Sequence, residues 1–451
     1  MRITAISLDT RIEQIFALQR ATRAARKSEP TASRIARLKG LRDAITARIG
    51  AIEEALHTDL RRAPNGGKEG EIPAVLGEID LAIANLEHWM APQPVPASPH
   101  FQGSLTFIQY EPRGVVLLLG AWNFPFALAL SPLVPILAAG NSAMVKPNEL
   151  SPATSKVVAE IIQATFDEQD VAVFEGGIEV AEALQQLPFD HVFFTGSPTV
   201  GKRVMAAAAR HLSSVTLELG GKCPAIVAPG YDLVDAAGKV TGARFNNAGQ
   251  LCLSVDHAWV PRAAVEPFCQ IVGAVIDKMF FVDGELQLER LPRLVNERNF
   301  DRVKGYIDEA VARGARIVRG GQYDRETLTI HPTVLVDVPL DARIMQEEIF
   351  GPVLPVLAYD DLEQVTAQVD ANGKPLAMYI FSQQQAFIDQ VLLNTSSGGV
   401  TVNHVFMHYL EPNLPFGGVN GSGMGRYHGH AGFIELSNGR STFIQGGSIT
   451  G

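Results

Sequence analysis

The sequence predicts an α/β protein built from two parallel-sheet domains. Short apolar strands alternate with amphipathic helices from about residue 115 onward, and the alternation restarts after Gly220-Gly221. At 451 residues the chain also exceeds what one hydrophobic core usually organises. Alternation of this kind indicates a parallel sheet with helices on both faces, which is typical of nucleotide-binding domains.

The first hundred residues are predicted to be helical. Apolar residues spaced by three and four between Ile35 and Leu60 draw one stripe along a single long helix. A second helix is expected near residues 71–90, and the proline-rich stretch after it indicates a stiff connector.

The strands and helices that follow form two series. In the first, the expected strands are residues 115–119, 143–146, 171–175 and 191–195, with helices at 152–166 and 180–186. In the second, the strands 225–227 and 257–260 flank a helical segment at 232–248. The boundary between the series is expected close to Gly220-Gly221.

The composition argues against several kinds of site. A net charge of −10 and a pI near 5.6 do not suit a general nucleic-acid-binding surface, which would be basic. Cys223, Cys252 and Cys269 are odd in number and widely spaced, so they predict neither a disulfide framework nor a zinc site. No metal is expected, and a reducing, cytoplasmic compartment is the natural interpretation.

One long uncharged stretch, residues 114–145, raises the alternative of a membrane span. Pro125, Pro132 and Pro135 interrupt it, and prolines at that density disrupt the helix that a bilayer requires. The first ten residues also lack the basic region and apolar core of a secretory signal. We therefore expect no membrane anchor.

Cys252 and Glu218 are the most informative pair of residues. They lie 34 positions apart (252 − 218), and each is set among small residues. A thiolate can attack a carbonyl carbon to form a covalent intermediate, and a carboxylate can activate the water that releases it. Taken singly, such a cysteine is more often a small buried hydrophobe, and such a glutamate a capping or ion-pairing residue.

The run FFTGSPTVGK, from Phe193 to Lys202, describes a strand, a glycine-bounded turn and a helix. Gly196 and Gly201 allow close backbone approach, and a helix N-terminus suits phosphate oxygens. A P-loop hydrolase would need Ser or Thr after Lys202 to hold magnesium, but Arg203 stands there. We therefore favour dinucleotide binding, with a plain strand-to-helix turn as the alternative for this motif alone.

Two further runs contain candidate ligand-binding residues. Asn123 follows a predicted strand at its carboxyl end, where open α/β sheets bind ligands, so its amide is a candidate donor to an oxyanion. Capping of the turn is the simpler interpretation. Glu348 and Phe350, in the run EEIFGP, suit either ribose binding or the start of an ordinary strand.

Together these motifs resemble the aldehyde dehydrogenase superfamily along nearly the whole chain. The matching runs, in the family's order and spacing, are Trp122-Asn123-Phe124-Pro125, Val145-Lys146-Pro147-Asn148-Glu149, Phe194-Thr195-Gly196-Ser197, Leu217-Glu218-Leu219-Gly220-Gly221-Lys222, Gly249-Gln250-Leu251-Cys252 and Glu348-Ile349-Phe350-Gly351-Pro352. Each run alone is weak evidence of the resemblance, but six runs in the family's order indicate it strongly. The glycine-rich run from Leu414 to Gly429 is similar to the class 3 branch, which includes fatty and aromatic aldehyde enzymes and bacterial coniferyl-aldehyde dehydrogenases.

The resemblance implies roles for the catalytic positions. Cys252 is the expected nucleophile and Glu218 the general base, while Asn123 and the backbone N–H of Cys252 form the oxyanion hole. The substrate is a small aldehyde, either a medium- or long-chain aliphatic one or an aromatic one such as coniferyl aldehyde.

The same resemblance implies a dinucleotide cofactor. Lys146 and Glu348 would hold ribose hydroxyls, and Phe350 would pack near the nicotinamide. Further expected cofactor-binding residues are Glu149, Gly196, Ser197 and Gly201. Glu149, if it faces the ribose bound by Lys146, would repel a 2′-phosphate, so NAD is expected and NADP stays open.

The family fold also adds a small β element that bridges subunits. We expect residues 1–99 and 112–220 to form the dinucleotide-binding domain and 221–410 the catalytic domain. Residues 100–111 and 411–451 would form the bridging and oligomerisation element of a homodimer.

The chain departs from the class 3 pattern beside the nucleophile. Leu251 and Cys223 replace the usual Thr and Ser, and Val255 and His257 replace the Pro and Tyr of a Pro-Asp-Tyr run. We expect these changes to affect the substrate pocket more than the chemistry. An acylating, coenzyme A-dependent enzyme, a P-loop nucleotide hydrolase and an inactive protein of the same fold remain as alternatives.

Overall fold

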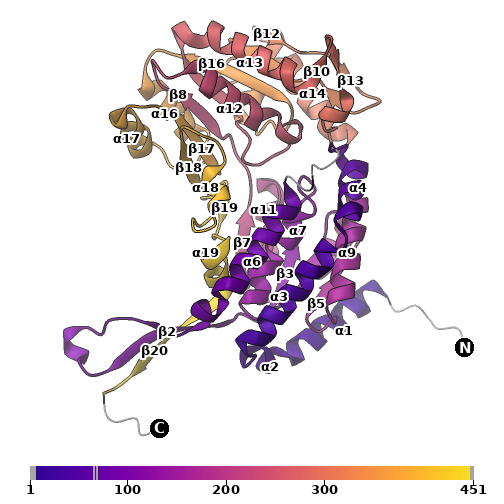
Figure 1. The fold of residues 1–451 in the computed structure, drawn as a ribbon, viewed down its shortest axis with the longest axis vertical. Coiled ribbons are helices and arrows are strands. Elements are labelled where there is room, and N and C mark those ends of the chain that lie inside the picture. Colours follow the sequence, from indigo (N-terminus) through magenta and orange to yellow (C-terminus); the bar gives the residue numbers. More distant parts are fainter. Residues whose placement is uncertain (1–6, 64–66, 68–69, 447–451) are drawn as a thin grey trace, which may run out of the picture.

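The computed structural model describes residues 7–63, 67 and 70–446. The chain forms two lobes, each built on its own mainly parallel sheet, and a β-ribbon that protrudes from one of them (Figure 1). Helices pack against both sheets, so the predicted α/β class is confirmed.

The first lobe contains a six-stranded sheet. Its strands, in spatial order, are β19 (Gly423–Met424), β7 (Ser214–Glu218), β6 (His191–Thr195), β3 (Val115–Leu119), β4 (Ser142–Lys146) and β5 (Val171–Val173). All neighbours are parallel except β19 and β7. The register pairs Leu119 with Lys146 and Thr195 with Glu218, so the last residues of four strands lie along one edge. That edge is where parallel sheets bind ligands.

Helices cover both faces of this sheet. They are α1 (Leu8–Ala21), α2 (Arg23–Lys27), α3 (Thr31–Thr46), α4 (Ile49–Leu60), α6 (Glu71–Met90), α7 (Ala127–Leu130), α8 (Leu133–Ala138), α9 (Pro152–Thr165), α10 (Ile178–Leu184) and α11 (Pro198–Ala209). The single long helix expected up to Leu60 is wrong, because the backbone leaves the helical region at Arg48 (φ −121°, ψ 17°). Ile45 and Ile52 are both fully buried on either side of this break, so the apolar spacing could not reveal it.

The second lobe contains a seven-stranded sheet. Its strands, in spatial order, are β12 (Arg316–Arg319), β15 (Thr333–Val336), β16 (Val353–Tyr359), β9 (His257–Pro261), β8 (Pro224–Val227), β17 (Ala377–Phe381) and β18 (Gly399–Val402). Only β12 runs antiparallel to its neighbour. The helices of this lobe are α12 (Leu233–Phe245), α13 (Val265–Phe280), α14 (Glu297–Ala312), α15 (Arg343–Gln346), α16 (Leu362–Ala371), α17 (Gln385–Asn394) and α18 (Met407–Leu410). Two short hairpins, β10 (Phe281–Val282) with β11 (Glu285–Leu286) and β13 (Tyr323–Asp324) with β14 (Thr329–Ile330), extend it.

The chain crosses from the first sheet to the second between β7 and β8. Gly221 has a φ of 153°, and a Cβ atom there would lie 3.2 Å from the backbone of Pro375. Glycine is therefore required both for this conformation and for the close approach of the second lobe. The crossing leaves Glu218, the last residue of β7, at the junction of the lobes.

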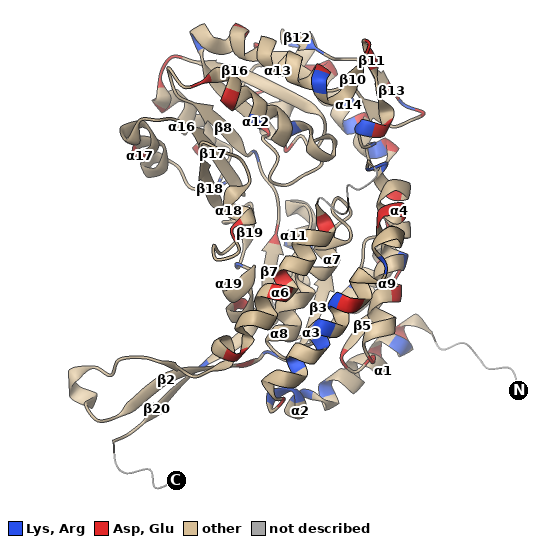
Figure 2. Ribbon diagram, viewed as in Figure 1, with Lys and Arg blue, Asp and Glu red and all other residues tan. Residues whose placement is uncertain are grey.

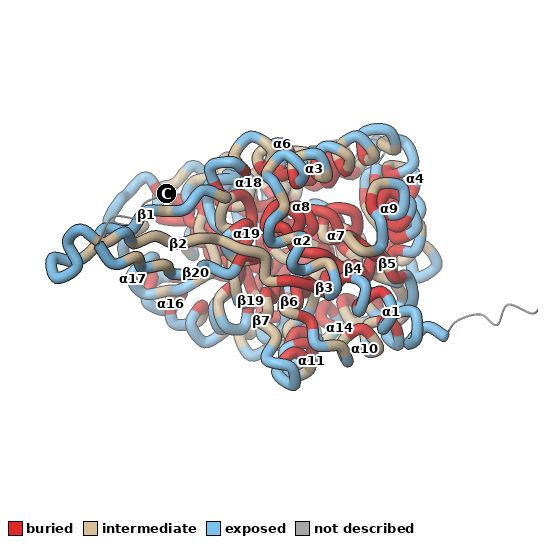
Figure 3. The backbone as a smooth tube through the Cα atoms, turned by 90° about the horizontal axis from the view of Figure 1, so that it is seen from below, coloured by how far each residue is buried: buried red, intermediate tan, exposed pale blue. Residues whose placement is uncertain are grey.

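The protruding ribbon contains β1 (Gln93–Pro94), β2 (Leu105–Pro112) and β20 (Ser437–Ile444), all antiparallel. Seen from below, it extends away from the buried core of the body (Figure 3). β1 pairs with β2, although residues 93–94 were expected in the dinucleotide-binding domain.

The C-terminal segment is also divided differently from the predicted bounds. β19 joins the six-stranded sheet, and α19 (Gly429–Glu435) packs against α6 and α8, so neither belongs to the ribbon. Only β20 does, and residues 447–451 lie outside the described residues. Two-residue strands such as β1 and β19 are too short to show the alternation by which a strand is recognised in a sequence.

The uncharged stretch 114–145 contains β3, α7, α8 and most of β4, and nearly all of it is buried. Within the described ranges, no helix combines the length and hydropathy needed to cross a membrane. Charged residues of both signs are spread over both lobes, with lysines and arginines frequent along α2 and α3 (Figure 2).

Candidate active site

A sharply bent loop after α12 presents Cys252. Asn247, Ala248 and Gly249 are consecutive left-handed residues, with φ values of 48°, 53° and 73°. The left-handed region is unfavourable for alanine, and such strain persists only where the surrounding structure enforces it. The loop then turns back on itself, because the Ser254 N–H donates to the carbonyl of Leu251 at 2.9 Å.

Cys252 is a partly exposed residue whose thiol lies near two carboxyl groups. Burial raises its pKa, and Glu348 and Glu218 raise it further. Directly behind the loop, the Cys223 thiol donates to the Cys252 carbonyl at 3.3 Å and accepts from the Ala377 N–H at 3.3 Å. Cys223 thus supports the loop backbone, while the Cys252 thiol needs a proton acceptor to become a nucleophile.

Glu218 is a suitable acceptor for the proton of the Cys252 thiol. Its side chain is only 3% exposed, and neither carboxylate oxygen has a hydrogen-bond partner among the described residues. Burial raises its pKa well above the ordinary value, and the attraction of Arg426 opposes this only in part. A carboxyl group whose pKa is raised in this way can take up a proton near neutral pH.

Asn123 lies against the loop that carries Cys252. Its side-chain Nδ2 donates to the carbonyl of Gln250 at 3.1 Å, two residues before Cys252. Its own carbonyl accepts from the Asn247 side chain at 3.0 Å and from Arg62 at 2.5 Å. The structure therefore brings the three predicted catalytic residues to one place, where the two lobes meet.

The predicted cofactor residues at the edge of the first sheet are already in contact with protein groups. Lys146, at the end of β4, forms a close ion pair with Glu149. The Ser197 hydroxyl caps α11 by accepting from the Val200 N–H at 3.4 Å, and a Cβ at Gly201 would lie 2.9 Å from Leu219. Gly201 therefore allows α11 to pack closely against Leu219, which follows β7.

One polar atom at this edge fits a bound group. The Thr195 hydroxyl, at the end of β6 just before Gly196-Ser197, is buried and has no hydrogen-bond partner among the described residues. A buried polar group without a partner costs free energy, so a ligand atom that pairs with it is favoured. Together with the N-terminus of α11, this site suits the polar parts of a dinucleotide.

Glu348 and Phe350 approach from the second lobe. The Glu348 carboxyl group packs directly on Gly220, where any side chain would collide with it. Burial first, and then Asp256, raises the pKa of Glu348 to about 8. Phe350, with a positive φ of 46°, makes an edge-to-face contact with Trp122 at 5.4 Å.

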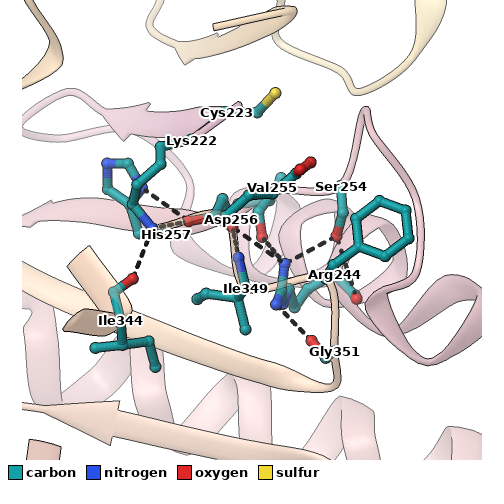
Figure 4. Close-up of polar contacts among 12 residues, drawn as sticks. Lys222, Cys223, Arg244, Ser254, Val255, Asp256, His257, Ile344, Ile349 and Gly351 are labelled. Atoms are coloured by element: carbon teal, nitrogen blue, oxygen red, sulfur yellow. Dashed lines mark hydrogen bonds and ion pairs between the residues drawn. The ribbon is translucent and has the colours of Figure 1, made fainter. Parts of the chain in front are cut away.

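A buried charged cluster that the sequence did not predict joins the loop that carries Cys252 to the loop that carries Glu348 (Figure 4). Asp256 forms a close ion pair with Lys222 and accepts from the Ile349 N–H at 2.9 Å. Arg244 donates to the carbonyls of Val255, at 3.2 Å, and of Gly351. The run after Cys252 is thereby attached to the loop that carries Glu348.

The departures from the class 3 pattern lie in or beside this cluster. Val255 and His257 are both fully buried, so they support the loops from behind, while Leu251 keeps some exposed surface. Nothing in the sequence marked Lys222, Arg244 and Asp256 as partners, because they are separated by up to 34 positions (256 − 222). The described residues contain no group of three or more side chains suited to hold a metal ion.

Comparison with known proteins decides the family. The family model described as "Aldehyde dehydrogenase family" matches residues 3–442. The chain belongs to the aldehyde dehydrogenase family. It is an NAD(P)-dependent oxidoreductase, as the motifs predicted.

Relatives of this aldehyde dehydrogenase include proteins of the class 3 type. It is 45% identical over 437 residues to the protein AldX of Bacillus subtilis, which has an aldehyde dehydrogenase name, and the match covers 96% of this chain and 98% of AldX. It is 40% identical to a Caulobacter vibrioides protein named "Probable coniferyl aldehyde dehydrogenase", with 89% and 84% covered. It is 38% identical to a rat protein named "Aldehyde dehydrogenase, dimeric NADP-preferring", with 91% and 90% covered.

Solved structures share the fold of this enzyme. A substrate-bound structure of Staphylococcus aureus AldH superimposes with a TM-score of 0.92 at 36% identity, covering 98% of this chain and 95% of that one. The aldehyde dehydrogenase-like fold expected from the motifs is therefore confirmed.

Proposed function

We propose that this aldehyde dehydrogenase oxidises an aldehyde to its carboxylate through a covalent intermediate on Cys252, with Glu218 as general base. The observation that carries the proposal is the Glu218 carboxyl group: it is buried, without a hydrogen-bond partner among the described residues, and close enough to the thiol to raise its pKa. A structural carboxylate would be paired, whereas a general base must keep its oxygens available.

The chemistry follows from the positions of the side chains. The Cys252 sulfur attacks the aldehyde carbon after giving up its proton, for which Glu218 is the acceptor. The new oxyanion is stabilised by the Asn123 amide and the backbone N–H of Cys252, and such preorganised donors contribute about 3–4 kcal/mol each. The bound nicotinamide ring supplies the hydride acceptor. After Glu218 has released the thiol proton to solvent, it removes a proton from the water that hydrolyses the Cys252 thioester, and the carboxylate product leaves.

The structure favours hydrolysis over transfer to coenzyme A. An acylating enzyme needs no base to activate water, so a buried carboxyl group kept free of partners would serve no purpose in deacylation. The second alternative, a P-loop hydrolase, is disfavoured because the Ser197 hydroxyl caps α11 and Arg203 stands where a magnesium ligand is required.

We propose that NAD is preferred over NADP. Lys146, the residue assigned to ribose hydroxyls, is already neutralised by Glu149, and a 2′-phosphate beside this pair would meet the Glu149 carboxylate. The substitution Glu149→Gln should raise kcat/KM with NADP by about tenfold and leave kcat/KM with NAD within about threefold. An unchanged ratio would show that the 2′-position lies elsewhere.

We propose aromatic aldehydes as the first substrates to test. A cluster of aromatic rings stands near the catalytic residues, with ring centroids 5.0 Å apart for Tyr409 and Phe416 and 5.8 Å for Phe416 and Tyr427. The pKa of Tyr427 is raised by burial and by its neighbours, among which are Glu218 and Cys252. Phe416 and Tyr427 are buried, whereas Tyr409 is partly exposed, so Tyr409 is the ring of this cluster that an aromatic ligand could meet edge to face. One relative also bears a coniferyl aldehyde dehydrogenase name.

We also propose that the enzyme is a cytoplasmic homodimer. β18 forms one edge of the seven-stranded sheet, and Leu393 and Leu410 near it are 85% and 60% exposed. The ribbon exposes Phe101 and Leu105 as well, at 53% and 59%. An open sheet edge and exposed apolar side chains offer a surface that a second chain can cover. The three free cysteines fit a reducing compartment.

The test is an assay of reduced-cofactor formation with short aliphatic, long-chain and aromatic aldehydes, coniferyl aldehyde included. NAD and NADP are run in parallel, and Cys252→Ala is compared with Cys269→Ala, a cysteine remote from the site in helix α13. We expect turnover that is lost only in Cys252→Ala. Equal activity in both variants would overturn the assignment of the nucleophile.

A further inference from the structure

We propose that Arg62 and Glu71 are positioning residues for the oxyanion hole: this buried ion pair holds the loop that carries Asn123. The inference rests on the proposed function, because it assumes that the Asn123 amide stabilises the oxyanion.

The pair contacts the Asn123 loop at three points. Arg62 Nη2 donates to the Asn123 carbonyl at 2.5 Å, and the guanidinium lies over the Phe124 ring, 4.3 Å from its centroid. Glu71 forms a close ion pair with Arg62 and, with its second oxygen, accepts from the Ala127 N–H at 2.7 Å. The pair therefore spans the loop from Asn123 to the first residue of α7.

The opposite side of Asn123 is held by the loop of the nucleophile. Asn247 donates to the same Asn123 carbonyl at 3.0 Å and to the Gln250 carbonyl at 3.1 Å, and Asn123 Nδ2 donates to Gln250 as well. Arg62 and Asn247 thus donate to the same Asn123 carbonyl. Together they fix the backbone of Asn123 between the segment after α4 and the loop that carries Cys252. Rotation of this peptide unit would move the Asn123 amide relative to Cys252.

The energetics favour a role in geometry over a role in stability. Arg62 is 7% exposed and Glu71 1% exposed, so both charges lost most of their hydration on folding. Buried ion pairs of this kind are often no more stabilising than apolar residues of similar volume, because desolvation offsets the attraction. What an apolar pair could not supply is a directed donor to the Asn123 carbonyl and a directed acceptor for the Ala127 N–H.

The experiment is a double-mutant cycle on kcat and KM. The variant Arg62→Met/Glu71→Leu removes both charges together, so that neither is left buried alone, and it is combined with Asn123→Ala. The exchange Arg262→Gln/Asp360→Asn, in an exposed ion pair of the second lobe, is the matched control. Thermal melting monitors folding, and Arg62→Lys, which keeps the charge but not the planar fork, replaces the double variant if that fails to fold.

We expect Asn123→Ala to lower kcat by about 10²–10³-fold. The Arg62→Met/Glu71→Leu variant should lower kcat by about 10- to 100-fold with KM within about threefold, since a misplaced donor affects the transition state most. In the Asn123→Ala background the same exchange should cost at most about twofold, because the group that it positions is already gone.

Two results would contradict the inference in different ways. Losses that multiply in the combined variant would show that the ion pair acts independently of Asn123 and would overturn the positioning role alone. A wild-type kcat in Asn123→Ala would overturn the oxyanion assignment itself, and the positioning role with it.

Discussion

Two buried carboxyl groups, Glu218 and Asp256, lie on opposite sides of Cys252, the proposed nucleophile, in sequence and have opposite environments. Asp256 accepts from the Ile349 N–H at 2.9 Å and forms a close ion pair with Lys222. Burial alone would raise its pKa, but Lys222, His257 and Arg244 outweigh burial and hold the pKa well below its usual range. Glu218 has no hydrogen-bond partner among the described residues, and its pKa is raised.

The difference separates a structural carboxylate, Asp256, from one that is free to react, the role proposed above for Glu218. Asp256 is ionised and saturated with partners, so it can attach one loop to another but cannot take up a proton at neutral pH. Glu218 carries a cost of burial that Arg426 offsets only in part, and its oxygens stay available for a substrate or a water molecule. Burial is common to both residues, and the number of partners decides their roles.

The largest expected effect comes from removing the reactive carboxylate. The substitution Glu218→Gln keeps the shape and removes the base, so the steady-state rate should fall by about 10²–10⁴-fold. Because Glu218 accepts the thiol proton before it activates water, the burst of reduced cofactor on rapid mixing should also be slowed. A burst of wild-type rate and amplitude would show that another group accepts the thiol proton and would restrict Glu218 to deacylation.

The next effect concerns the structural carboxylate. Asp256→Asn leaves Lys222 buried without its charge partner, which should lower the free energy of unfolding by about 3–5 kcal/mol. Denaturant or thermal unfolding measures this loss. The matched control is Asp360→Asn, whose ion pair with Arg262 is exposed and should contribute less than about 1 kcal/mol. Equal losses in the two variants would contradict the structural role of Asp256.

The smallest effect is on stability and depends on pH. Because the folded-state pKa of Glu218 lies above its unfolded value near 4.5, its contribution to stability is fully present below that pH and is lost as the pH rises. Glu218→Gln should therefore melt close to wild type at pH 5 and a few degrees higher at pH 8. Asp256→Asn should melt lower than wild type at both pH values. A Glu218→Gln variant that is destabilised at pH 8 would show that the carboxylate has favourable partners.

Several elements could be predicted from the sequence because their signals are local. β3 and β6 have the predicted bounds, since β3 is a continuous apolar run between two glycines and β6 is an apolar run enclosed by His191 and Thr195. The helix α6 also begins and ends where its periodic spacing does. The break between α3 and α4 was missed because the apolar stripe keeps its spacing across it, and β19 because two residues carry no period.

By itself the sequence determined the α/β class, the family motifs and the chemical type of each candidate residue, all of which depend on neighbours along the chain. Only the tertiary structure decided which of these residues are partnered. Arg62 reaches Asn123 across 61 positions and Asp256 reaches Ile349 across 93, whereas Glu218 finds no partner within the described residues. Hydrogen bonding and desolvation depend on distance in space, and no local pattern specifies which distant groups will meet a buried carboxyl group.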